Sequence, residues 1–253
     1  MKSEFYHSLS LMMVATALLA FSGVVNASTM DDRIELTAKQ SYVFKTYLQS
    51  DDIKIHSKEG VVSLTGTVSE NPHKALAQET VAGLPGVKSV DNRLEVKGAA
   101  PTANSDAWLR DKVKVTLLFH RSVNSGTINV DVKNNIVTLR GETASQTQKD
   151  LATEYATDVE GVSSVHNEMT VTTTPEKTRT VGEIIDDASI TAQVKLTLLY
   201  HRSTSAINTK VETKGGLVTL YGKARNAAEM SLASKLANDV AGVKEVNNRM
   251  TIE

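Results

Sequence analysis

The six histidines are the side chains of this sequence best suited to bind a metal ion or transfer a proton. They stand at positions 7, 56, 73, 120, 166 and 201, and none belongs to an H-E-x-x-H motif or a similar ligand spacing. The sequence contains no G-x-S-x-G nucleophile motif, no glycine-rich phosphate loop and no cysteine. We therefore expect no catalytic residues, no metal site and no cofactor, and hence a protein that is not an enzyme.

Two of these histidines belong to a repeated tripeptide, His-Arg-Ser, at 120–122 and 201–203. The simpler interpretation is structural, because cationic side chains at the end of a helix interact favourably with its carbonyl end. The alternative is a basic helix with aromatic side chains that contacts anionic lipid headgroups. Its candidate lipid contacts, which we expect on the protein surface, are Trp108, Lys112, Lys114, Arg121, Lys195 and Arg202.

The charge balance argues against nucleic acid as a partner. Lys and Arg number 28 and Asp and Glu number 29, giving a formal net charge of −1, whereas nucleic-acid-binding proteins carry a basic patch or stripe. Aromatic residues make up 4% of the chain. That low share suits several small cores better than one large core.

The N-terminus has the organisation of a secretory signal peptide. A basic start at Lys2 precedes an apolar run over residues 9–25, which is shorter than the roughly 20 residues that span a bilayer. Small residues then occupy the cleavage position, Val-Asn-Ala at 25–27. We expect residues 1–27 to be a signal peptide that is removed after Ala27, with a retained membrane anchor as the alternative.

One pattern occurs three times along the rest of the chain. A V-(S/T)-L-x-G string is followed, 20 residues after its glycine, by a G-V-x-x-V-x-N string. The period of 75 to 81 residues exceeds the roughly 20–50 residues of solenoid repeats, so each copy should be a small domain. We expect the glycines to serve tight turns or close packing and the asparagines to bond nearby backbone. The nine motif residues are Gly66, Gly86, Asn92, Gly141, Gly161, Asn167, Gly222, Gly242 and Asn248.

Each copy is predicted to fold as a small α+β unit of order αββαβ. Its first helix has apolar residues at every fourth position, as at Leu109, Val113 and Leu117, and acidic residues such as Asp106 and Asp186-Asp187 open it. A β-hairpin, a second helix and a last strand with alternating apolar residues follow. We expect a two-layer sandwich, a three-stranded mixed sheet with both helices on one face. The predicted domains are 31–97, 105–172 and 183–253, with linkers around Pro101 and Pro175.

These motifs resemble the BON domain, named for bacterial OsmY and nodulation proteins. Together with the signal peptide, the tandem copies are similar to osmotically inducible OsmY-type proteins of the periplasm. The resemblance implies a periplasmic location, association with the envelope, induction by osmotic or other envelope stress, and binding to phospholipid membranes. The chain departs from the usual pattern in having three copies rather than two, and the first copy lacks His-Arg-Ser.

Three functions remain open at this point. The first is a non-enzymatic periplasmic stress protein that binds anionic phospholipid membrane surfaces. The second is a protein-interaction or chaperone-like adaptor that binds envelope proteins through exposed sheet faces or edges. The third, a sensor of small ions or solutes, has only scattered carboxylates to support it.

Overall fold

The computed structural model describes residues 24–98, 102, 104–123, 128–172, 184–204 and 208–253. The predicted signal peptide lies outside the described residues except for 24–27, which begin a helix. Pro101 and Pro175 of the two predicted linkers also lie outside them.

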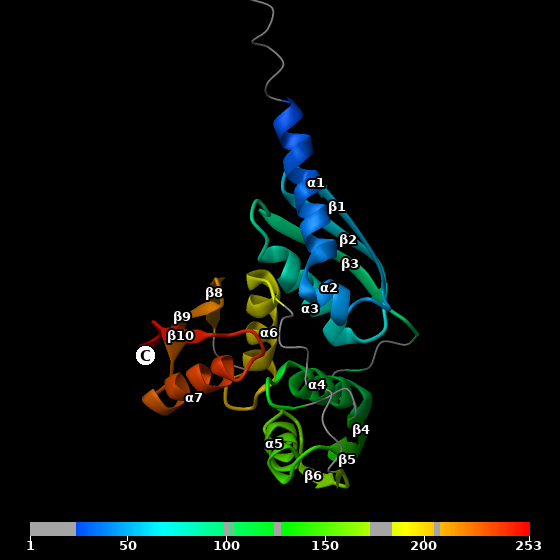
Figure 1. Ribbon diagram of the computed structural model, residues 1–253, viewed down its shortest axis with the longest axis vertical. Helices are drawn as coiled ribbons and strands as arrows, with labels where there is room; N and C mark the ends of the chain where they lie inside the picture. Colours follow the sequence, from blue (N-terminus) through cyan, green and yellow to red (C-terminus); the bar gives the residue numbers. More distant parts are fainter. Residues whose placement is uncertain (1–23, 99–101, 103, 124–127, 173–183, 205–207) are drawn as a thin grey trace, which may run out of the picture.

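The first repeat is a three-stranded mixed sheet that carries its helices on one face (Figure 1). Its first two strands form an antiparallel hairpin, and its third strand runs parallel to the second after a helical crossover. Its elements, in chain order, are α1 (Val24–Gln40), α2 (Tyr42–Thr46), β1 (Asp52–Lys58), β2 (Val61–Val68), α3 (Asn71–Ala82) and β3 (Ser89–Val96).

The second and third repeats have the same topology, so the chain is three tandem α+β units, as predicted. Repeat 2 comprises α4 (Asp106–Phe119), β4 (Ile128–Lys133), β5 (Ile136–Thr143), α5 (Gln146–Thr157), β6 (Ser164–Asn167) and β7 (Thr170–Val171). Repeat 3 comprises α6 (Asp187–Tyr200), β8 (Thr209–Lys214), β9 (Leu217–Ala224), α7 (Ala227–Asn238), β10 (Glu245–Asn248) and β11 (Thr251–Ile252).

In repeats 2 and 3 the last strand consists of two short segments where one continuous strand was expected. In repeat 2 both segments keep one register against β5, with Asn167 opposite Leu139 and Thr170 opposite Glu142. Between them the N–H of Glu168 still donates to the carbonyl of Leu139 at 2.8 Å, and the N–H of Met169 donates to the side chain of Asn167 at 3.0 Å, as the N–H of Leu94 does to Asn92 in the unbroken strand of repeat 1. The interruption is therefore local and does not change the sheet order.

The apolar residues form two cores that do not follow the repeat boundaries. Repeats 2 and 3 share one cluster, to which α4 contributes Leu109, Val113 and Leu117. The core of repeat 1 extends onto α4 and α6, which bury Phe119 and Leu196 against it. Both helices therefore have apolar residues on opposite sides, as expected of a helix enclosed between layers. Figure 1 shows α4 and α6 in the centre of the molecule, between repeat 1 and the sheets of repeats 2 and 3.

Candidate functional site at the junctions between repeats

Repeats 2 and 3 meet where the end of α4 pairs with the end of α7. The N–H of Arg121 donates to the carbonyl of Asp239 at 2.9 Å, and the N–H of Ala241 donates to the carbonyl of Phe119 at 3.0 Å. His120 and Val240 form an antiparallel bridge between them. The His-Arg-Ser segment of repeat 2 therefore binds the second helix of repeat 3.

The same contacts recur in the opposite direction. At the end of α6 the N–H of Arg202 donates to the carbonyl of Asp158, and the N–H of Glu160 donates to the carbonyl of Tyr200, both at 2.9 Å. Each repeat thus gives and receives equivalent contacts, as two subunits related by a two-fold axis do in a dimer. We call this surface the reciprocal junction, formed by 119–121 with 239–241 and by 200–202 with 158–160.

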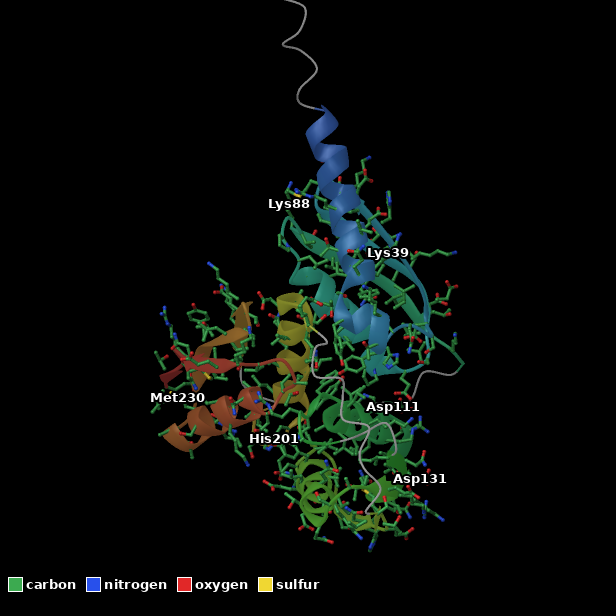
Figure 2. The ribbon with its side chains drawn as sticks, in the orientation of Figure 1. Lys39, Lys88, Asp111, Asp131, His201 and Met230 are labelled. Atoms are coloured by element: carbon green, nitrogen blue, oxygen red, sulfur yellow. The ribbon has the colours of Figure 1, made fainter. Side chains whose placement is uncertain are left out.

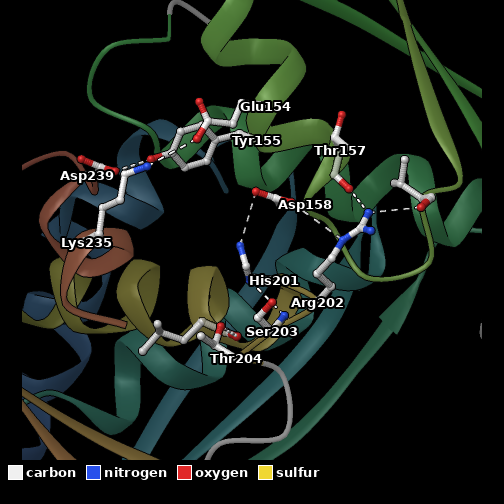
Figure 3. Close-up of polar contacts among 12 residues, drawn as sticks. Glu154, Tyr155, Thr157, Asp158, His201, Arg202, Ser203, Thr204, Lys235 and Asp239 are labelled. Carbon is white, nitrogen blue, oxygen red and sulfur yellow. Dashed lines mark hydrogen bonds and ion pairs between the residues drawn. The ribbon is translucent and has the colours of Figure 1, made fainter. Parts of the chain in front are cut away.

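The two arginine side chains bind backbone carbonyls of the neighbouring repeat, at the end of its second helix or in the turn that follows. Nη2 of Arg121 donates to the carbonyls of Val240 and Val243 at 3.2 and 2.7 Å. Nη2 of Arg202 donates to the carbonyl of Val162 at 3.2 Å and to that of Thr157 (Figure 3). The carbonyl of Thr157 belongs to the last residue of α5, where the helix dipole favours a cation, whereas the other three lie in the turns that follow α7 and α5. The two arginines thus bond across the junction rather than to the ends of their own helices.

The two histidines of the His-Arg-Ser segments each accept a backbone hydrogen bond at Nδ1. Nδ1 of His120 and Nδ1 of His201 each accept the backbone N–H of the serine two residues later, at 3.1 Å. That bond places the proton of the neutral ring on Nε2. Both side chains are buried, and burial lowers the pKa of each, against the opposing attraction of Asp239 on His120 and of Asp158 on His201.

A polar cluster surrounds the histidines on one side of the reciprocal junction. The ring of His120 packs edge-on against Tyr155 with centroids 4.1 Å apart, and the Tyr155 hydroxyl donates to Asp239 (Figure 3). Burial and this carboxylate raise the pKa of Tyr155. Lys235 and Glu154 add an exposed ion pair at 3.4 Å. The raised pKa of Tyr155 and the lowered pKa values of His120 and His201 favour the neutral form of all three side chains, which suits a packed junction.

Lys112 is enclosed at the crossing of α4 and α6. Only 2% of its surface is exposed; its Nζ lies 4.1 Å from the ring centre of Trp108 and 5.3 Å from that of Tyr200. It donates to the carbonyl of Glu160 at 3.2 Å. Burial lowers the pKa of Lys112 although Glu160 opposes that shift, and burial raises the pKa of Tyr200 to about 12. Asp111, beside Lys112 in sequence and labelled in Figure 2, is likewise buried.

The remaining basic candidates bind repeat 1. Nζ of Lys114 lies 3.0 Å from a carboxylate oxygen of Glu70, and Nζ of Lys195 lies 2.6 Å from one of Glu79. Lys114 extends from α4 and Lys195 from α6 toward the first repeat. Because both pairs are partly exposed, each adds little to stability by itself.

Repeat 1 is also joined to repeat 3 through a shared helix cap. Asp186 caps α6 by accepting the N–H of Ser189 at 2.9 Å, and its second oxygen accepts the N–H of Tyr42 at 2.7 Å. The hydroxyl of Ser189 accepts the next N–H of α2, from Val43, at 3.1 Å. One carboxylate thus serves the N-termini of two helices from different repeats.

The structure therefore brings five of the six predicted lipid contacts to contacts between repeats and encloses the sixth beside them. Arg121 and Arg202 are exposed at their edges but bonded to carbonyls, and Lys114 and Lys195 are ion-paired. Lys112 is buried and covers a half-buried Trp108. Five of these residues therefore contribute to contacts between repeats, whereas the contact of Trp108 with Lys112 lies within repeat 2.

Two further properties of the described residues bear on function. No group of three or more His, Asp or Glu side chains in the described ranges could hold a metal ion. No helix within those ranges is long and apolar enough to cross a membrane.

Comparison with known proteins identifies the repeated unit. The family model described as "BON domain" matches residues 30–98, 105–173 and 186–253. The chain belongs to the BON domain family. All three BON repeats contain the V-(S/T)-L-x-G and G-V-x-x-V-x-N strings.

Three relatives share part of this BON protein's length. Over 143 residues it is 34% identical to Osmotically-inducible protein Y of Escherichia coli (strain K12), covering 56% of this chain and 70% of that protein. It is 31% identical over 157 residues to a 21 kDa hemolysin of Actinobacillus pleuropneumoniae, covering 62% and 72%. It is 33% identical over 121 residues to Outer membrane lipoprotein DolP of Haemophilus influenzae, covering 48% and 60%. A solved structure of CdsD from Chlamydia trachomatis overlaps at 17% identity, 87% of this chain and 90% of that one, with a TM-score of 0.24, from which nothing follows for this chain.

The BON asparagines fasten the last strand of each repeat to its second helix. Nδ2 of Asn167 donates to the carbonyl of Lys149 and to the hydroxyl of Thr153, both at 2.8 Å, and its Oδ1 accepts the N–H of Met169. Asn248 makes the equivalent three bonds, and Asn92 does so with a glutamine in place of the hydroxyl. Their role is thus internal to each BON unit.

The BON glycines occupy backbone positions that a side chain would disturb. The three in the second hairpin strand, Gly66, Gly141 and Gly222, lie two residues before its end and have φ of 114°, 128° and 134°. A Cβ at Gly66 or Gly222 would collide with the carbonyl where the opposite strand begins. The second set, Gly86, Gly161 and Gly242, has φ between 89° and 100° and lies against residues at the start of the first helix.

Sequence reasoning missed a second function of the acidic residues that open α4 and α6 and of their equivalent inside α1. Asp31, Asp106 and Asp187 each accept two backbone N–H groups from the turn of their own hairpin, at 2.7 to 3.0 Å. Those hydrogen bonds lower the pKa of Asp106. The signal was present in the sequence, because each aspartate stands 28 residues before the first residue of its turn.

Proposed function

We propose that this BON protein is a non-enzymatic protein of the periplasm that acts during osmotic or other envelope stress by binding other proteins. The family match and a relative named for osmotic induction support the stress role. A second relative, named as an outer membrane lipoprotein, supports the envelope location. The expected signal peptide at 1–27 supplies the route of export.

The single observation that favours a protein partner over a lipid partner is the placement of the basic residues. An electrostatic membrane contact needs cationic side chains free to face the headgroups. Here Lys112 is enclosed between aromatic rings, and the exposed Arg121 and Arg202 donate to backbone carbonyls of the neighbouring repeat. Lipid headgroups would have to compete with those hydrogen bonds for the two arginines.

Protein partners, by contrast, find free hydrogen-bonding surfaces on the same structure. The first hairpin strands, β1, β4 and β8, lie at sheet edges, and an edge strand offers unpaired backbone groups to another chain. The solvent-facing positions of β8 include Lys210, Glu212 and Lys214, a charged surface that suits a polar partner better than a membrane interior.

In-cell photo-crosslinking tests this function. A photoreactive amino acid at Lys214, in an edge strand of repeat 3, should give protein adducts in the periplasm after an osmotic upshift. The control is Asp150, an exposed residue of helix α5 that lies on no sheet edge and should give fewer adducts. Lipid adducts in place of protein adducts would contradict the proposal, and so would the absence of any adduct from all exposed edge positions.

A further inference from the structure

A hollow runs along the free edge of β8. It has a volume of about 640 Å³ and is lined by β8 and α6 of repeat 3 and, on its opposite side, by Ala82 and Gly83 at the end of α3 in repeat 1. A second hollow of about 290 Å³ continues toward the start of the strand and shares Lys195 and Val211 with the first. Together they follow β8 from Lys214 to Thr209.

The backbone of β8 offers hydrogen bonds to this hollow. The two-residue turn at 215–216 makes Lys214 and Leu217 a directly bonded pair, and such pairs alternate along a hairpin. The N–H and C=O groups of Val211 and Thr213 therefore point away from β9, toward the edge. Both residues also line the larger hollow.

A polar side chain in the smaller hollow is also unsatisfied. The hydroxyl of Thr209 is buried and has no hydrogen-bond partner among the described residues. A buried hydroxyl without a partner costs free energy unless a ligand or water supplies one. This atom, unlike the edge itself, indicates that something polar completes the site.

We propose that an extended segment of another polypeptide binds between β8 and α3 as an added strand. Because Ala82 and Gly83 of repeat 1 line the hollow opposite β8, a single added strand suits it better than the edge of a folded sheet. The wall beside it is made of small residues, Ala82, Gly83 and Ala188, so the segment carries small aliphatic or hydroxyl side chains at alternate positions. This inference rests on the proposed function and specifies its site.

The test uses the full mature chain and a fluorescein-labelled peptide of eight alternating valines and threonines. A second peptide of the same sequence carries methyl groups on alternate backbone nitrogens and cannot pair with a strand. The unmodified peptide should bind, and the methylated one should bind at least tenfold more weakly, the loss expected from about one missing hydrogen bond or more.

Two variants locate the peptide on β8. Thr213→Pro removes the outward N–H and should weaken binding about tenfold. The control Thr213→Val keeps that N–H but, like proline, loses the hydroxyl bond to Thr191, and it should bind the peptide as the wild type does. Ala82→Trp fills the hollow from an exposed position outside the core and should also weaken binding. The Ala82→Trp variant still tests the site if the Thr213→Pro variant does not fold.

Equal binding of both peptides, or unchanged binding by the Ala82→Trp variant, would overturn the strand-addition site, and so would no binding of either peptide. The proposed function fails on a different result. If the Ala82→Trp chain still gives the periplasmic protein adducts at other edge positions, the protein-binding function stands and only this site is wrong.

Discussion

Removing Arg121 and Arg202 is the sharpest perturbation of the reciprocal junction. Each guanidinium donates two hydrogen bonds to backbone carbonyls of the other repeat, at the end of its second helix or in the turn that follows. A hydrogen bond that involves a charged group contributes about 1.5–3 kcal/mol when buried, but these side chains are partly solvated; we expect about 1–2 kcal/mol per arginine. Arg121→Ala and Arg202→Ala should each lower the free energy of unfolding by that amount.

The assay is urea unfolding of the mature chain, followed by circular dichroism and by the fluorescence of Trp108. This residue is the one tryptophan of the chain and lies against Lys112 beside the junction. Arg93→Ala serves as the control, because Arg93 makes an exposed ion pair with Asp91 and its loss should cost at most about 0.5 kcal/mol. If both junction variants unfold like the Arg93 control, the arginines do not hold the repeats together.

Three further predictions follow from the structure. Asn167→Ala removes three partly buried hydrogen bonds and should lower the free energy of unfolding by about 2–3 kcal/mol in the same assay, well beyond the effect of an exposed substitution. Burial lowers the pKa of His120 and His201 in the folded chain, so the unfolded chain binds more protons below about pH 6.5. The free energy of unfolding should therefore fall as the pH is lowered through that range. The His120→Asn, His201→Asn double variant should show a smaller fall. Lys112→Met should be nearly neutral or stabilising, since an aliphatic side chain of similar length avoids burying a cation; a loss above 2 kcal/mol would show that the cation itself is needed.

The repeat architecture could be predicted from the sequence because it depends on local signals. The glycine spacing, the hairpin turns and the alternation in the last strands are all properties of one copy, and the family match and the sheets confirm the fold class. Even so, the sequence pattern gave no sign of the break in the last strands of repeats 2 and 3, because the three copies share the alternating apolar residues and the asparagine, and the strand of repeat 1 is unbroken.

The junctions could not be predicted from one copy, because they depend on which surfaces meet. The apolar residues of α6 that face its own sheet, such as Ile190 and Val194, gave the helix its predicted amphipathic face. A second row, Ala188, Ala192, Leu196 and Tyr200, also recurs every fourth position and packs on repeat 1. Apolar residues on two sides of one helix were the available sign that it is enclosed.

The same reason explains the basic candidates. A cation at the end of a helix has the same sequence signature whether it faces solvent, a headgroup or a carbonyl of the next repeat. Arg121 and Arg202 face carbonyls because repeats 2 and 3 are arranged reciprocally. The absence of His-Arg-Ser from repeat 1, visible in the sequence, agrees with its different position across α4 and α6.

Co-sedimentation with vesicles tests most directly whether these helix ends join repeats or bind membranes. The mature chain and its Arg121→Glu, Arg202→Glu double variant are mixed at low salt with vesicles of phosphatidylglycerol or of phosphatidylcholine, and their melting temperatures are measured in parallel. The structure predicts that the wild-type chain stays in the supernatant with both lipids and that the double variant melts several degrees lower. A wild-type chain that sediments with the anionic vesicles alone, together with a double variant that is released at an unchanged melting temperature, would contradict this account.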